Sequence, residues 1–223
     1  MTTTKAPVGI LGGTFDPVHH GHLRLAMELV NELQLDHVRL IPNGRPPHRG
    51  APNAAPGQRA KWIRVAVASE PRLRLDDREL LRDGPSYTVD TLASLHDTLP
   101  GQPLCLVMGR DVFAKLPEWH QWQRLFELAH IILINRPDLD IELQPAAHEQ
   151  LDARVTTDIR ALHEATAGLI YSYAPPPLAI SASRIRDLLA TGHSPRYLLP
   201  DSILDDIMDA GVYQSPENPQ PIS

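Results

Sequence analysis

The sequence predicts an α/β protein with a doubly wound, mainly parallel sheet and helices on both of its faces. Short apolar runs typical of buried strands alternate along the chain with segments in which apolar residues recur at helical spacing. Such alternation favours parallel strands with helices covering both sides of the sheet. The chain has 223 residues, of which 42% are hydrophobic, and this composition suits one domain with a sizeable core.

In the first half of the chain, strands and helices follow one another at short intervals. We expect strands at 7–11, 38–41 and 73–75, and helices at 22–33 and 58–69. A further helix should begin after Pro85, with Ser86 or Thr88 as its cap and Val89 and Leu92 on its buried face.

The second half continues the alternation and ends in a small helical part. We expect strands at 104–108, 131–134 and 169–173, and helices at 146–162, 180–189 and 200–210. Another helix should end near Ala129. Gly211 is well placed to end the last helix, because glycine readily adopts the left-handed conformation that often follows a helix.

Charge and composition argue against several classes of protein. The formal net charge of −6 gives no support for a nucleic-acid or membrane-surface partner, since those partners usually require a basic patch. There is no apolar run of about 18 residues and no signal-peptide pattern, so we expect a cytoplasmic protein. Its oligomeric state stays open between a monomer and a small homo-oligomer. Cys105 is the only cysteine, which excludes an intrachain disulfide and a cysteine-rich metal site.

The segment from Gly9 to His22 combines a strand end, a glycine turn and two histidines spaced three apart, His19 and His22. Gly12 and Gly13 let the backbone approach a phosphate, and the following helix start offers unpaired N–H groups and a partial positive charge. A glycine pair or a histidine alone is more often structural. Their coincidence at the carboxyl end of the first strand, where open α/β sheets bind ligands, favours a nucleoside triphosphate site.

A second anion site is indicated by Ser181, Ser183 and Arg186, at the start of the helix predicted at 180–189. Hydroxyls, helix N–H groups and a guanidinium can converge there on one anion. A serine cap beside a solvated arginine is the more common arrangement when this pattern stands alone. Together with the first motif, it predicts two helix starts that face one triphosphate.

Two further features follow predicted strands. Gly109 and Asp111 come directly after the strand at 104–108, at the sheet edge where ligands bind. The loop at 42–56 carries Arg49 and is too long for a plain connector, so it is either a functional loop or a solvated, flexible one.

These motifs resemble those of the nucleotidylyltransferase family. That family has a glycine turn, a phenylalanine-aspartate-proline step and a histidine-x-glycine-histidine, as at 12–22, and an isoleucine-serine motif that ends in isoleucine-arginine, as at 180–186. Further blocks resemble its bacterial nicotinate mononucleotide adenylyltransferase branch; they lie at 46–49, 78–80, 84–92, 108–111 and 119. The resemblance implies a Rossmann-like domain at 1–190 and a C-terminal helical extension and tail at 191–223, packed on the same domain.

The resemblance also implies a reaction, namely transfer of the adenylyl group of ATP to nicotinate mononucleotide with release of pyrophosphate. The product would be nicotinate adenine dinucleotide. The catalytic residues would be His19, His22 and Arg186. ATP would contact these residues together with Gly12, Gly13, Thr14, Phe15, Gly109, Asp111, Ser181 and Ser183. Nicotinate mononucleotide would contact Thr14, Arg49, Tyr87, Thr88, Trp119 and Arg136.

Mg²⁺ is expected as the cofactor, bound mainly through the ATP phosphates, because the sequence has no tight carboxylate cluster. Asp16 is a candidate to reach the ion through water. Two alternatives stay open: another adenylyltransferase, such as phosphopantetheine adenylyltransferase, and a nucleotide-binding regulator without turnover. The Pro-Ser-Tyr-Thr segment at 85–88 and Trp119 argue against the first, and intact histidine and Ser183 motifs argue against the second.

Overall fold

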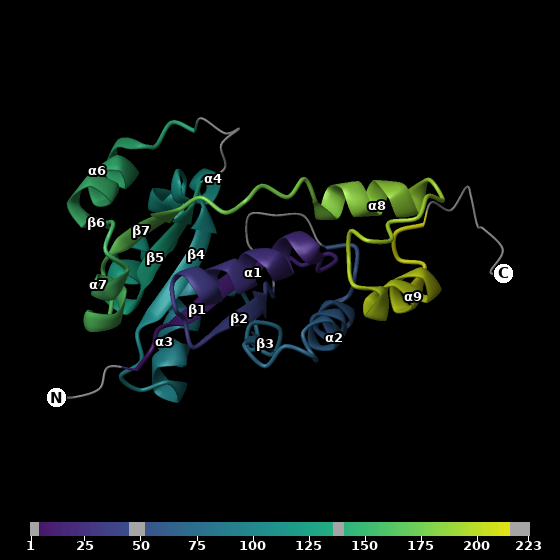
Figure 1. The fold of residues 1–223 in the computed structure, drawn as a ribbon, viewed down its shortest axis with the longest axis horizontal. Helices are drawn as coiled ribbons and strands as arrows, with labels where there is room; N and C mark the ends of the chain where they lie inside the picture. Colours follow the sequence, from purple (N-terminus) through teal and green to yellow (C-terminus); the bar gives the residue numbers. More distant parts are fainter. Residues whose placement is uncertain (1–4, 45–51, 136–140, 215–223) are drawn as a thin grey trace.

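The structure, a computed structural model, describes residues 5–44, 52–135 and 141–214, and these contain a seven-stranded parallel sheet (Figure 1). The strands lie in the order β3-β2-β1-β4-β5-β7-β6, and all neighbouring strands are parallel. Their bounds are β1 Val8–Gly13, β2 His37–Pro42, β3 Leu73–Leu75, β4 Leu104–Gly109, β5 His130–Ile134, β6 Val155–Thr156 and β7 Ile170–Tyr173. The predicted fold class is confirmed.

Helices cover both faces of the sheet. Side chains of α1, α2, α7, α8 and α9 belong to the core of one face, and those of α3, α4, α5 and α6 belong to the core of the other. The helices are α1 His20–Glu32, α2 Pro56–Ala66, α3 Thr88–Thr98, α4 Arg110–Phe113, α5 Leu125–Leu128, α6 Pro145–Arg154, α7 Ile159–Glu164, α8 Ala182–Ala190 and α9 Asp201–Ala210. Two short 3-10 helices, η1 Leu116–Glu118 and η2 Trp122–Arg124, precede α5.

The strands read as continuous apolar runs because both of their faces are buried. In β4, Cys105 and Val107 pack into the core on the α1 side, whereas Leu104 and Leu106 pack into the core on the α3 side. Cys105 is fully buried, and burial raises the pKa of its thiol to about 12. The single cysteine is therefore a packing residue without a reactive thiolate.

The order of the strands marks one edge of the sheet as the place for a ligand. From β1 the chain adds β2 and β3 on one side, and it then crosses to the other side of β1 to add β4 and β5. Open α/β sheets bind ligands outside the carboxyl ends of the strands at such a reversal. In this protein the reversal lies between β1 and β4, so their carboxyl ends mark the expected site.

The prediction of one helix at 146–162 was wrong. The chain forms α6, the two-residue edge strand β6 and then α7, and β6 pairs with β7. Val155, Thr156 and Thr157 are β-branched and favour extended backbone. Asp158 then starts α7, because its carboxylate accepts a hydrogen bond from the N–H of Arg160 at 2.9 Å.

The expected cap of α3 was also wrong. Tyr87, in extended conformation, is the residue that precedes the helix, and no side-chain hydrogen bond caps it. The hydroxyl of Ser86 instead donates to the main-chain oxygen of Glu79 at 3.3 Å. This partner lies seven positions earlier, outside the helix, and it takes the hydroxyl that would otherwise cap α3.

The C-terminal helices pack beside the first half of the chain. Figure 1 shows a long extended connection from β7 to α8, with α9 beside α2. Asp206 of α9 accepts hydrogen bonds from Lys61 and from Nε1 of Trp62, the latter at 2.6 Å. Gly211 ends α9 with φ of 61°, as predicted. Within the described residues, no helix combines the length and the apolar character needed to cross a membrane.

Candidate active site

The turn from β1 to α1 places two histidine rings against each other at the start of the helix. The imidazoles of His19 and His22 stack with centroids 3.7 Å apart and an interplanar angle of 24°. The main-chain N–H of His19 donates to Nδ1 of His22 at 3.3 Å. Because Nδ1 accepts, the neutral ring of His22 carries its proton on Nε2 and presents a donor there.

Close packing fixes these rings. Phe15 is buried, adopts φ of 48°, and presents an edge contact to His22 with centroids 4.8 Å apart. A Cβ at position 21 would lie 3.0 Å from two atoms of the His19 ring, so Gly21 lets that imidazole rest on the helix backbone. The left-handed conformation of Phe15 costs on the order of 1 kcal/mol and persists only because its surroundings determine it.

The predicted front and rear motifs line one cavity of about 820 Å³. From the front come Gly13, Thr14, Phe15, His19 and His22, and from the rear come Ser181, Ser183 and Arg186. Gly12, the preceding residue of β1, is not among the lining residues. The volume lies within the range usual for small-molecule sites, roughly 300–1,000 Å³.

Arg186 bridges the two motifs. Its Nη1 donates to the main-chain oxygen of Asp16 at 2.8 Å, and its Nη2 donates to Oγ of Ser183 at 3.2 Å. Ser181 caps α8, because its hydroxyl accepts from the N–H of Arg184 at 3.2 Å. The simpler reading of Ser181 as a helix cap therefore holds, while Ser183 and Arg186 form a guanidinium and hydroxyl pair at the cavity.

A buried arginine that the motifs did not indicate, Arg59, supports the turn after β1. Arg59 of α2 is fully buried, and it donates to the main-chain oxygens of Thr14 at 2.7 Å and Asn43 at 2.9 Å. Burial lowers the pKa of Arg59, and the negative charge of Asp16 opposes that shift. The only signal in the sequence was its helical spacing from the apolar pair Trp62 and Ile63, which places Arg59 on the inner face of α2.

Asp16 is held by protein donors. Its Oδ2 accepts from the N–H of Asn53 at 2.8 Å, and its Oδ1 accepts from the N–H of Ala54 at 3.0 Å and from the hydroxyl of Tyr213 at 2.6 Å. These bonds do not support Asp16 as a contact for a metal ion. Among the residues that the structure describes, no group of three or more histidine, cysteine, aspartate or glutamate side chains is placed to hold a metal.

Gly109 and Asp111 lie at the carboxyl end of β4, beside β1, outside the lining of the cavity. Gly109 precedes α4, and the carboxylate of Asp111 folds back over it so closely that a Cβ at position 109 would collide with Oδ1. The glycine thus makes room for the aspartate at this strand end.

Of the predicted acceptor residues, Tyr87 and Thr88 lie at the start of α3, whereas Thr14 lines the cavity of the histidine and Ser183 motifs. The Tyr87 ring lies against the ring of His120, with centroids 4.4 Å apart, and Tyr87 and the half-buried Trp119 pack on the same core cluster. Thr88 is the first residue of α3. Sequence reasoning missed His120, which no motif singled out. Arg49 and Arg136 lie outside the described residues.

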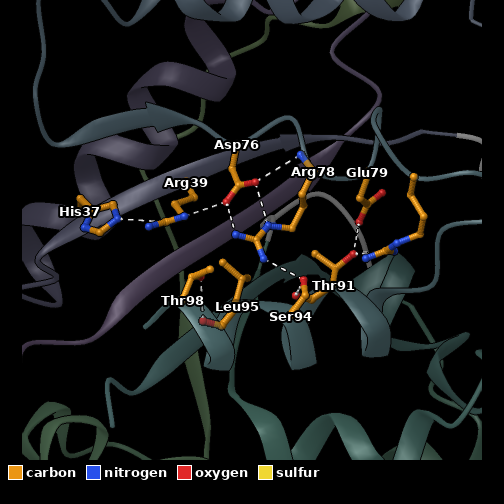
Figure 2. Close-up of polar contacts among 10 residues, drawn as sticks. His37, Arg39, Asp76, Arg78, Glu79, Thr91, Ser94, Leu95 and Thr98 are labelled. Carbon is orange, nitrogen blue, oxygen red and sulfur yellow. Dashed lines mark hydrogen bonds and ion pairs between the residues drawn. The ribbon is translucent and has the colours of Figure 1, made fainter. Parts of the chain in front are cut away.

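An ion-pair network after β3 braces α3 (Figure 2). Asp76 accepts from Nη1 of Arg39 at 2.8 Å and from Nε and Nη2 of Arg78 at 2.8 and 2.9 Å, and Arg78 also donates to Ser94 at 2.7 Å. Burial alone would raise the pKa of Asp76, but the hydrogen bonds from Arg78 and Arg39 outweigh it and lower the pKa. The end of β3 is thereby tied to the middle of α3.

Glu79 joins the same helix to the end of β2 (Figure 2). It is buried, and its carboxylate accepts from Oγ1 of Thr91 at 2.8 Å and from the N–H of Gly44. Burial raises the pKa of Glu79, in spite of these hydrogen bonds and the nearby charge of Arg82. A Cβ at Gly44 would collide with the main-chain oxygen of Glu79, so these two segments meet backbone to backbone.

Comparisons with known proteins agree with this arrangement. A family model described as Cytidylyltransferase-like matches residues 10–188. The chain is 47% identical to a protein of Aeromonas salmonicida (strain A449) named "Probable nicotinate-nucleotide adenylyltransferase", over 95% of this chain and 99% of that relative. A protein of Pseudomonas syringae pv. tomato with the same name is also 47% identical, over 97% of both chains.

The fold is similar to that of a solved structure titled "Plasmodium falciparum nicotinic acid mononucleotide adenylyltransferase complexed with NaAD". The TM-score is 0.70 at 16% identity, over 93% of this chain and 97% of that chain. The family match covers most of the chain, and the curated relatives match it almost from end to end. The chain belongs to the cytidylyltransferase-like family, among its nicotinate-nucleotide adenylyltransferases.

Proposed function

We propose that the cavity between α1 and α8 is the ATP site of a nicotinate-nucleotide adenylyltransferase, and that the start of α3 forms the site of the second nucleotide. The enzyme makes nicotinate adenine dinucleotide from nicotinate mononucleotide and ATP. One observation carries the assignment of the cavity: stacked His19 and His22 share it with Ser183 and Arg186. Imidazole, guanidinium and helix N–H donors suit a polyphosphate.

In this proposal the β1 turn and α8 hold the triphosphate from two sides. Gly13, Thr14 and Phe15 present backbone to the nucleotide, and His19 and His22 lie at the reacting phosphate. Gly12 precedes them in β1, outside the lining of the cavity, and is proposed to contact the nucleotide only at the end of that strand. Ser183 and Arg186 bind the β- and γ-phosphates, while Ser181 supports them by capping their helix. Gly109 and Asp111, at the end of β4, bind the ribose or adenine side.

The chemistry is adenylyl transfer by positioning and charge stabilisation. An oxygen of the mononucleotide 5′-phosphate attacks the α-phosphorus of ATP, the bond from that phosphorus to the bridging oxygen breaks, and pyrophosphate leaves. His19, His22 and Arg186 stabilise negative charge on the phosphoryl oxygens and the leaving group. We propose direct transfer without a covalent enzyme intermediate. Cys105 is buried and protonated, and the hydroxyls of Ser181 and Ser183 accept hydrogen bonds from Arg184 and Arg186 of α8.

The second nucleotide lies at the start of α3. The first N–H groups of a helix precede its internal hydrogen bonds, so Tyr87 and Thr88 offer backbone donors to the nicotinate carboxylate. Trp119 stacks on the cationic pyridinium ring, which is favourable over an indole face. Thr14 is proposed as a further contact of this nucleotide, and Arg49 and Arg136 are proposed to bind its 5′-phosphate or its carboxylate.

Mg²⁺ is proposed as the cofactor, and its ligands are phosphate oxygens and water. The donor set around the cavity supports this view, because the described residues bring cations and N–H groups to the phosphates. When bound, the ion neutralises charge on the phosphates.

Pyrophosphate release tests the proposed function. The purified protein, supplied with ATP and Mg²⁺, should release pyrophosphate with nicotinate mononucleotide and not with phosphopantetheine. A parallel assay with nicotinamide mononucleotide measures acceptor preference, which we expect to favour the acid because backbone N–H donors at α3 favour a carboxylate. Binding of ATP without pyrophosphate release would contradict the proposal.

A further inference from the structure

A tyrosine near the C-terminal end of the described chain contacts the catalytic turn. Tyr213 is buried, follows α9 and donates its hydroxyl to Oδ1 of Asp16 at 2.6 Å, across 197 positions of sequence. Its ring also packs near Trp62 of α2, with centroids 6.1 Å apart. Residues 10–188 contain the whole match to the family model, so Tyr213 lies beyond it.

Two distant segments of the chain meet at the side chain of Asp16. Tyr213 comes from the C-terminal part, Asn53 and Ala54 precede α2, and all three donate to the Asp16 carboxylate. Burial and the hydrogen bond to Asp16 both raise the pKa of Tyr213, so its hydroxyl keeps the proton that it donates. The carboxylate is therefore fixed from outside its own turn.

The backbone of Asp16 connects its carboxylate to the groups that face the cavity. Its main-chain oxygen accepts from Nη1 of Arg186, and the preceding residue, Phe15, packs its ring edge against His22. Phe15 adopts a left-handed conformation that isolated L-residues rarely populate, so this turn depends on contacts made elsewhere. A change at the Asp16 carboxylate can thus reach both Arg186 and the histidine pair.

We infer that Tyr213 is a positioning residue for ATP: by holding the Asp16 carboxylate, it fixes the turn that aligns Arg186 with His22 at the triphosphate. The inference rests on the proposed function of the cavity. It gives the C-terminal extension a role on the ATP side, while α3, which starts at the proposed acceptor site, packs in the core of the opposite face of the sheet.

The test compares Tyr213→Phe with Asp206→Ala. The first variant removes only the hydroxyl, and the second weakens the docking of α9 on α2 without touching Asp16. Tyr213→Phe should raise the KM for ATP about tenfold, the scale of one hydrogen bond to a charged group, with the mononucleotide KM within about twofold. Asp206→Ala should lower Tm without changing either KM, measured well below Tm.

Coupling to Arg186 separates positioning from general stability. In an Arg186→Lys background, Tyr213→Phe should change kcat/KM for ATP by less than about twofold, since both changes act through the same contact. The inference is overturned if Tyr213→Phe lowers Tm as Asp206→Ala does and leaves the ATP KM unchanged. It is also overturned if Tyr213→Phe lowers kcat/KM for ATP by the same factor in the Arg186→Lys background as in the wild type.

A readout without turnover keeps this test apart from the proposed function. ATP alone should raise the Tm of the wild-type protein, and the rise should be smaller for Tyr213→Phe. If wild-type protein shows the ATP shift but releases no pyrophosphate, the proposed function fails while the role of Tyr213 is still measured. An equal ATP shift in the variant and the wild type contradicts the role.

Discussion

The proposed ATP site and the proposed acceptor site of this enzyme are stabilised over very different sequence distances. On the ATP side, Arg186 bonds to Asp16 across 170 positions and Tyr213 bonds to the same residue across 197. On the acceptor side, the ion pairs and hydrogen bonds of Figure 2 join residues between His37 and Thr98. The proposed ATP site therefore forms only when the two ends of the chain are packed together, whereas the contacts that brace the proposed acceptor site all lie within the first half of the chain.

This difference predicts distinct effects of substitution. Changes at the ATP side should damage catalysis or global stability, and changes at the acceptor side should be confined to one substrate or to a narrow pH range.

Replacing His19 with alanine should lower kcat by on the order of 10²–10³, because it removes a preorganised donor where charge develops. The measurement is steady-state kinetics at saturating ATP and mononucleotide. His20→Ala, at the adjacent position and outside the stacked pair, is the control and should stay within about threefold. A comparable loss in both variants would mean that the helix start, rather than the His19 ring, matters.

Arg59→Met should lower the free energy of unfolding by about 3 kcal/mol, since the main-chain oxygens of Thr14 and Asn43 lose their buried donor and Asp16 loses a nearby positive charge. Denaturant unfolding measures the change. Arg64→Met on the same helix removes an exposed, 3.5 Å ion pair to Asp77 and should cost less than about 0.5 kcal/mol. An equal decrease in the free energy of unfolding for the two variants would contradict the role given to Arg59.

Trp119→Ala should raise the mononucleotide KM about tenfold and the ATP KM much less, because the indole contributes cation–π stacking to one substrate. Trp122→Ala is the matched control, since Trp122 packs edge-on against Phe126 and should affect stability instead. Equal increases in both KM values for Trp119→Ala would refute its assignment to the acceptor site.

Glu79→Gln should flatten the pH dependence of stability. The pKa of Glu79 is raised by burial, so the folded state favours the protonated form. The stability that the protonated Glu79 contributes to the folded state is present below the ordinary glutamate pKa. This stability is lost as the pH rises through the raised pKa of the folded state. The variant should therefore gain stability relative to wild type as pH rises above about 4.5, the usual range for glutamate. A steeper pH dependence in the variant would contradict this assignment.

Local sequence patterns predicted most of this fold, because parallel strands and amphipathic helices have short periods. Strands such as β4 and helices such as α1 and α9 lie close to where spacing placed them. The failures occurred where a short element interrupted a longer pattern, as at β6, or where a partner in the preceding loop took the hydroxyl expected to cap a helix, as at Ser86.

For the site, motifs located the groups that line the cavity, while the groups that hold them in place were missed. His19, His22, Ser183 and Arg186 stand in recognisable spacings, and the structure brings them to one cavity. Arg59 and Tyr213 occupy ordinary positions in sequence, and their roles depend on contacts to Thr14 and Asp16 that only the folded chain makes. No period or spacing encodes such pairs.

The buried thiol of Cys105 in β4 also provides an internal probe of unfolding. Cys105 is the one cysteine of the sequence and lies at the centre of the sheet, so a thiol reagent can reach it only when the sheet opens. The rate of its alkylation would therefore measure the free energy of opening under native conditions, one site per molecule. Because the proposed chemistry uses no thiol, the same labelling can be followed while the enzyme turns over.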